Sequence, residues 1–102
     1  MEMEKLPKID YDKMVEKVRE VMQKRGRKAQ LLRQLAGEIT GFDFSDSKIR
    51  YTRIHKFPMI FRVAQVYKKV DDGILLVNFC ENGEYVIWGS YISDKFLPTY
   101  VP

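Results

Sequence analysis

The segment GILLVNFCENGEYVIW at residues 73–88 decides the fold, because it joins two apolar runs through Asn82-Gly83. Asn-Gly between apolar runs is the strongest short signal for a β-hairpin. The sequence therefore predicts antiparallel strands at residues 74–80 and 85–91. A two-residue turn would pair Cys80 with Tyr85, Phe79 with Val86 and Val77 with Trp88.

Two more strands are predicted upstream, where the apolar period changes from 3.6 to 2. Residues 48–57 alternate in character until Pro58, which cannot donate a backbone hydrogen bond and so interrupts the strand. The next strand covers residues 59–69. Asp-Asp-Gly at residues 71–73 suits a three-residue loop that ends on a left-handed glycine and would pair Val70 with Ile74. Four consecutive strands predict an antiparallel meander, which a strong curl could close.

The N-terminal half predicts two helices that form a hairpin over residues 11–41. Apolar residues recur at helical spacing from Tyr11 to Met22, and Gly26 follows where a left-handed C-cap is needed, so the first helix is predicted over residues 11–25. A second periodic set runs from residue 29 to 39 and ends at Gly37 or Gly41. One long helix kinked at Gly26 is the alternative. The expected fold class is α+β, with an N-terminal helical hairpin packed on a four-stranded antiparallel meander in two layers.

The length of 102 residues predicts a single domain. Its parts are the helical hairpin at 11–41, the sheet at 48–92 and an extended apolar tail at 93–102. The N-terminus lacks the apolar centre of a signal peptide, so we expect an intracellular, cytoplasmic protein that is not secreted. One cysteine and one histidine exclude an internal disulfide and metal sites with several such ligands. No metal or cofactor is expected.

Both faces of the predicted sheet are too apolar to lie open to water, so something must cover the second face. The candidates are the C-terminal tail, barrel closure, a second subunit or a ligand. The row Tyr67–Val77–Trp88 lies at the centre of the more aromatic face, which also carries Phe79. Such a row could stack on bases or anchor a protein partner, or it could be core beneath the helices. The predicted partner-binding residues are Tyr67, Phe79 and Trp88.

Charge is segregated along this chain of net charge +4. Residues 21–37 carry five bases and residues 47–70 carry seven, both without an acid, whereas residues 71–102 have a net charge of −4. Basic segments attract phosphates or acidic surfaces, although they can also be solvated faces. The second segment also interleaves aromatic side chains, which can stack on unpaired bases. The predicted nucleic-acid-binding residues are Arg25, Arg27, Lys28, Arg33, Lys48, Arg50, Arg53, Lys56 and Arg62.

These features predict a small non-enzymatic protein that binds nucleic acid through basic helix and strand surfaces. The alternative is a protein–protein adaptor or a homodimeric module that uses an apolar sheet face or groove. No phosphate-cradling glycine loop is visible, and a Cys80–His55 nucleophile pair lacks anything to position it. We therefore predict no catalytic residue. The scarcity of Asn and Gln beside plentiful Lys, Arg and Glu is a bias found in proteins from hot environments. Small proteins of this kind are also frequent among viruses and mobile elements.

Two short stretches carry a resemblance to a known architecture. These are Val-Ala-Gln-Val-Tyr at residues 63–67 and Val-Asn-Phe-Cys-Glu-Asn-Gly-Glu-Tyr-Val at residues 77–86. Over about a third of the chain, the segment 63–92 resembles a Tudor or other SH3-like small barrel. Such domains bind methylated side chains or nucleic acid through aromatic cages and loops. The helical N-terminal half departs from that pattern, and no functional residue is carried over.

Overall fold

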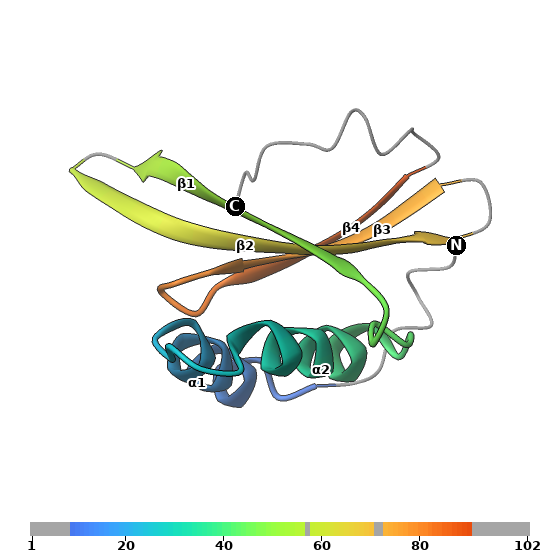
Figure 1. Cartoon of the computed structure of the whole chain (residues 1–102). Coiled ribbons are helices and arrows are strands. Elements are labelled where there is room, and N and C mark those ends of the chain that lie inside the picture. The colour runs from blue at the N-terminus through green and yellow to red at the C-terminus, as the bar shows by residue number, and fades with distance from the viewer. Residues whose placement is uncertain (1–8, 57, 71–72, 91–102) are drawn as a thin grey trace.

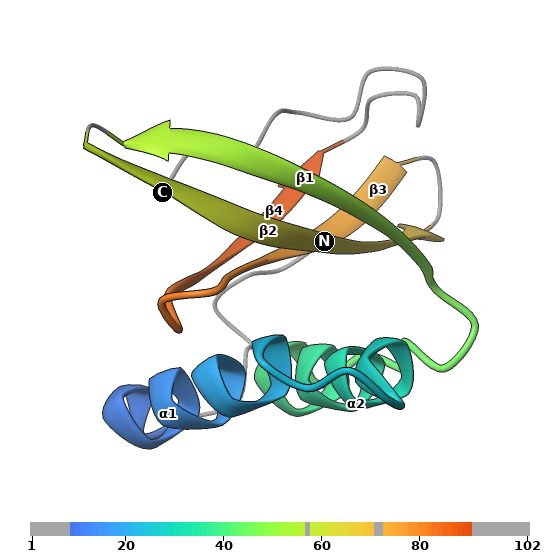
Figure 2. The same ribbon diagram turned by 60° about the vertical axis from the view of Figure 1, so that its left-hand side comes forward.

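The computed structural model describes residues 9–56, 58–70 and 73–90, which form two layers. Helices α1 (Tyr11–Met22) and α2 (Lys28–Thr40) lie side by side against one face of a twisted sheet, as Figure 1 shows. The strands are β1 (Lys48–Lys56), β2 (Met59–Val70), β3 (Gly73–Cys80) and β4 (Tyr85–Ser90), and they pair antiparallel in the order β1-β2-β3-β4. The predicted α+β fold is confirmed. The sheet is open rather than closed into a barrel, with β1 and β4 at its edges (Figure 2).

The helix ends differ from the prediction at the connection between the two helices. Helix α1 begins after Asp10, whose carboxylate accepts the N–H of Lys13 at 3.3 Å, but it ends at Met22 and not at residue 25. Gly26 does not take the left-handed conformation expected of a C-cap. Arg27 takes it instead, with φ of 60°, where it serves as the N-cap of α2. The short connection therefore uses its left-handed residue to start the second helix rather than to end the first.

The main core lies between the helices and the sheet. Val18 and Met22 of α1 and Leu32 of α2 pack with Val77 and Phe79 of β3, and all five are buried. Their burial removes apolar surface from water and supplies the main stabilisation of the two-layer arrangement. The remaining buried members of this cluster are Met14, Val21, Leu35, Ala36, Ile39, Phe44, Ala64, Val66 and Leu75.

The register of the β3–β4 hairpin corrects the prediction by one residue. Phe79 pairs with Tyr85, because the loop contains three residues rather than two. The N–H of Gly83 donates to the carbonyl of Cys80 and the N–H of Cys80 donates to the carbonyl of Glu84, both at 2.9 Å. Gly83 has φ of +101°. This is the three-residue hairpin in which a glycine takes the left-handed position at the end of the loop.

The β2–β3 register is also shifted by one residue, since Val70 pairs with Gly73 and not with Ile74. Both registers of β3 are therefore shifted by one residue. Relative to β2 and β4, each side chain of β3 lies on the face of the sheet opposite to the predicted one. The row predicted as Tyr67–Val77–Trp88 is therefore Tyr67–Leu76–Trp88. Phe79 lies in the helix-side core at 0% exposure, where no partner can reach it.

The sheet face opposite the helices, called the outer face below, carries Tyr67 and Trp88, both half-buried. A row of polar side chains also crosses it. The Arg50 guanidinium donates through Nε to Oε1 of Gln65 at 2.7 Å, and Nε2 of Gln65 donates to Oδ1 of Asn78 at 2.8 Å. Gln65 is 0% exposed, so these hydrogen bonds satisfy an amide that would otherwise be costly to bury. The predicted apolar tail at 93–102 lies outside the described residues.

Candidate nucleic-acid interface

The structure divides the predicted basic residues between the two sides of the sheet. Arg53 pairs with Arg62 across β1 and β2, two residues along from the pair Tyr51–Ala64. Residues two apart on a strand share a face, and Ala64 belongs to the helix-side core, so Arg53 and Arg62 project to the helix side. The same alternation places Lys48, Arg50 and Lys56 on the outer face. The basic residues therefore do not form one continuous strand surface.

The helix-side cations meet at a depression of about 260 Å³ where α2 begins beside β1 and β2. Lys28, Arg53 and Arg62 line it together with the ring of Tyr51, and we call this set the cationic depression. Arg25 and Arg27 are exposed in the connection between Met22 and Lys28, which both line the depression. Its lining is completed by Met22, Thr52 and Val63.

Like charges are held close together in the cationic depression. Arg53 stands directly opposite Arg62 on the neighbouring strand, an arrangement that repels. Burial lowers the pKa of Lys28, and the charge of Arg62 lowers it further, whereas Glu81 acts in the opposite direction. Among the residues that the structure describes, no ion pair involves Lys28 or Arg53. The depression is thus a concentration of positive charge that an anion would relieve.

Glu81, the acid whose charge acts on Lys28, is already engaged by Arg62. Its Oε1 accepts the backbone N–H of Arg62 at 2.8 Å, and its Oε2 accepts Nε of the guanidinium at 3.2 Å. The backbone hydrogen bond is the main cause of a lowered pKa for Glu81; the Arg62 guanidinium and Lys28 add to it, against the raising effect of burial. Glu81 therefore holds Arg62 at the depression but balances only part of the charge there.

This arrangement predicts that Glu81 stabilises the fold at neutral pH and loses this effect in acid. Because the pKa of Glu81 is lower in the folded chain, its contribution is present above the pKa of an unfolded glutamate, about 4.3, and is lost as the pH falls through the folded value. Glu81→Gln should therefore lower the free energy of unfolding in urea at pH 7, and the deficit should shrink at pH 3. Glu38→Gln is the control for net charge, since Glu38 lies 3.6 Å from Lys17 on the helices. An equal deficit of Glu81→Gln at both pH values would contradict this expectation.

Tyr51 is a site residue that the sequence-based set did not include. The residue is 55% exposed although its side chain projects to the helix side, and Nζ of Lys28 lies 5.7 Å from the centroid of its ring. This distance places the ammonium within range of a cation–π interaction. The signal was present in the sequence, because Tyr51 is two residues before Arg53 on a strand and therefore shares its face.

The other predicted basic residues lie elsewhere, and most have partners within the chain. Nε of Arg33 donates to the carbonyl of Ser47 at 3.0 Å and so ties α2 to the start of β1. Lys56 lies 4.0 Å from Glu84, and Arg50 belongs to the polar row of the outer face. Lys48 lines a separate hollow of about 310 Å³ with Asp46, Tyr67, Lys68 and Lys69. Arg33, Lys48, Arg50 and Lys56 therefore lie outside the cationic depression.

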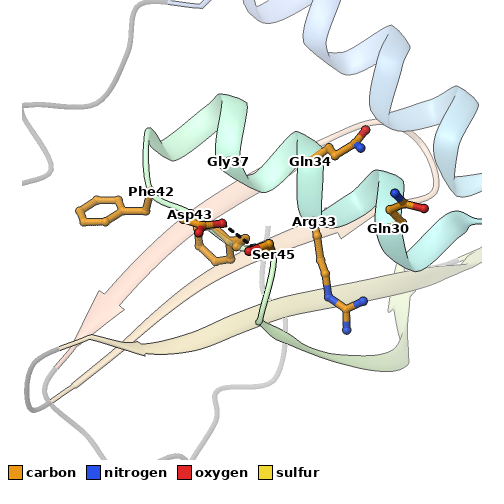
Figure 3. Close-up of a pocket in the computed structure, with 8 residues that line it drawn as sticks. Gln30, Arg33, Gln34, Gly37, Phe42, Asp43 and Ser45 are labelled. Carbon is orange, nitrogen blue, oxygen red and sulfur yellow. Dashed lines mark hydrogen bonds between the residues drawn. The ribbon is translucent and has the colours of Figure 1, made fainter.

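The polar side chains around a hollow of about 340 Å³ between α2 and the following loop do not converge on one point (Figure 3). The side chains of Arg33 and Phe42 point in different directions from its two ends. Oδ1 of Asp43 accepts the N–H of Ser45 at 2.8 Å, and this hydrogen bond is the main cause of the lowered pKa of Asp43. Polar groups that diverge in this way do not define a ligand site.

The structure separates the one cysteine–histidine pair that the chain offers. His55 pairs with Ile60 and Cys80 pairs with Val63, and these partners on β2 are three residues apart, so the two side chains project from opposite faces of the sheet. Cys80 is 1% exposed, and burial raises the pKa of its thiol. Within residues 9–56, 58–70 and 73–90, no three His, Cys, Asp or Glu side chains gather as a metal site requires. No helix in this part of the chain is long and apolar enough to cross a membrane.

Comparisons with models of protein families, with curated proteins and with solved structures found no match to this chain. The functional interpretation therefore depends on the geometry of the cationic depression.

Proposed function

We propose that this chain is a non-enzymatic protein that binds nucleic acid, with phosphates held at the cationic depression. The observation that carries the proposal is the meeting of Lys28, Arg53 and Arg62 around one hollow, where Glu81 is the one opposing charge found among the residues that the structure describes. A cluster of like charges costs folding stability, and a phosphate backbone offsets that cost when it binds. Arg25 and Arg27 extend the same positive surface along the connection between the helices.

The test is a salt titration of binding to fluorescein-labelled DNA and RNA oligonucleotides, both single- and double-stranded. Each phosphate contact contributes about 0.7–0.9 to the slope of log affinity against log salt. The double variant Lys28→Gln/Arg53→Gln should therefore lose affinity about tenfold or more at low salt and reduce the slope by about 1.5. Lys13→Gln/Lys17→Gln is the matched control, since it removes the same charge from the exposed side of α1.

An equal loss of affinity in the control would show that net charge alone drives binding and would overturn the assignment to the depression. Absence of salt-dependent binding by the wild type would overturn the proposal itself. A dimer in light scattering together with that absence would favour the alternative function, an interaction module that uses the outer face with Tyr67 and Trp88.

A further inference from the structure

We infer that the nucleic acid bound at the cationic depression is single-stranded, with an unpaired base stacked on the ring of Tyr51. The inference rests on the proposed function and adds the class of strand and the residue that selects it. It starts from a combination in this fold: the exposed side chain of Tyr51 lies beside three cations on the helix side of the sheet, where Phe79 is core and Tyr85 is partly buried.

The positions of the side chains fit the parts of one nucleotide. Tyr51 and Arg53 project from the same side of β1, about 7 Å apart along the strand. A base on the ring and its phosphate near the guanidinium would therefore lie within the reach of one nucleotide. Lys28, whose Nζ lies 5.7 Å from the ring centroid, is placed to contact the same phosphate. The hollow of about 260 Å³ has room for a group of that size.

A duplex would gain nothing from Tyr51. Its bases stay stacked on one another and present only their edges in the grooves, so a ring at the surface has no base face to meet. Single strands offer those faces, and stacking on an aromatic side chain contributes substantially to their binding. Within the part of the chain that the structure describes, β1 is an edge strand, and no other strand there lies along its outer edge to block a bound strand from running past Tyr51.

The experiment compares a 12-nucleotide oligodeoxythymidine with a 12-base-pair duplex at one salt concentration. The wild type should bind the single strand more tightly. Tyr51→Ala should lose about 5- to 150-fold in affinity for the single strand, should leave the duplex affinity unchanged and should keep the salt slope of the wild type. Tyr51→Phe keeps the stacking face and should bind within about twofold of the wild type.

Phe42→Ala is the matched control, because Phe42 is also an exposed aromatic side chain but lies in the loop after α2, away from the depression. Thermal unfolding by circular dichroism verifies that each variant is folded. The inference is overturned if Tyr51→Ala binds the single strand as the wild type does, or if it loses affinity for both ligands equally. The variant Lys28→Gln/Arg53→Gln tests the proposed function separately. If it reduces the salt slope while Tyr51→Ala has no effect specific to the single strand, the proposed function stands and only the inference about Tyr51 fails.

Discussion

Phe79→Ala should lower the free energy of unfolding by about 3–5 kcal/mol, the range for removing a fully buried aromatic ring. The ring is 0% exposed and lies in the core between the helices and β3, together with Val18 and Leu32. Removal would leave a cavity that the flanking backbone of the sheet cannot collapse into, because hydrogen-bonded neighbours hold β3 on both sides. A loss of this size is a large part of the stability of a small domain.

Urea unfolding of Phe79→Ala and Phe42→Ala would measure the effect. Phe42 is 40% exposed, so its truncation should cost much less, within about 1 kcal/mol. The two variants remove the same side chain from a buried and an exposed position. If Phe79→Ala were as stable as the wild type, the ring would not be core, and the predicted role of Phe79 as a contact for a partner would regain support.

Gly83→Ala should destabilise the fold by about 2–5 kcal/mol, through backbone strain and a steric clash together. Gly83 has φ of +101°, a region that L side chains rarely adopt. An added Cβ would also lie 2.5 Å from the carbonyl oxygen of Val15 and 2.7 Å from its Cγ1. The first of these atoms is backbone of α1, so the clash is relieved only if the helix moves away from the β3–β4 hairpin.

Gly26→Ala is the matched control, because a Cβ there would meet nothing within 4 Å. Its melting temperature should stay close to that of the wild type, whereas that of Gly83→Ala should fall by about 10 °C or more. The contact between Nε of Arg19 and the carbonyl of Asn82, 3.3 Å long, should be lost with the displaced helix. A normal melting temperature for Gly83→Ala would show that α1 yields at little cost.

The order and type of the elements were predictable from the sequence, because each period of apolar residues is local. The registers were not, because Asn82-Gly83 is compatible with hairpin loops of two or three residues. In the folded chain Gly83 also lies against Val15 of α1, a contact between residues far apart in the chain that a local pattern does not show. One residue of loop length then decided the side on which Phe79 lies.

The positive charge of the candidate site was predictable from the sequence, but which basic residues meet there was not. The basic segments are visible in the sequence, but the meeting of Lys28 with Arg53 and Arg62 requires the helix connection and the β1–β2 pairing together. The partners of Arg33 and Arg50, namely the Ser47 carbonyl and the Gln65 side chain, likewise depend on tertiary contacts. Alternation along β1 alone would have grouped Tyr51 with Arg53.

The position of β1 at the edge of the sheet has a consequence for solubility. An exposed strand invites pairing with another chain, and charged side chains on that strand oppose it. An antiparallel copy of β1 centred on Thr52 would bring Lys48 opposite Lys56, and like charges in such a pair repel. Neutralising the cations of β1 therefore removes two properties at once: the attraction of phosphate and the resistance of the edge to aggregation.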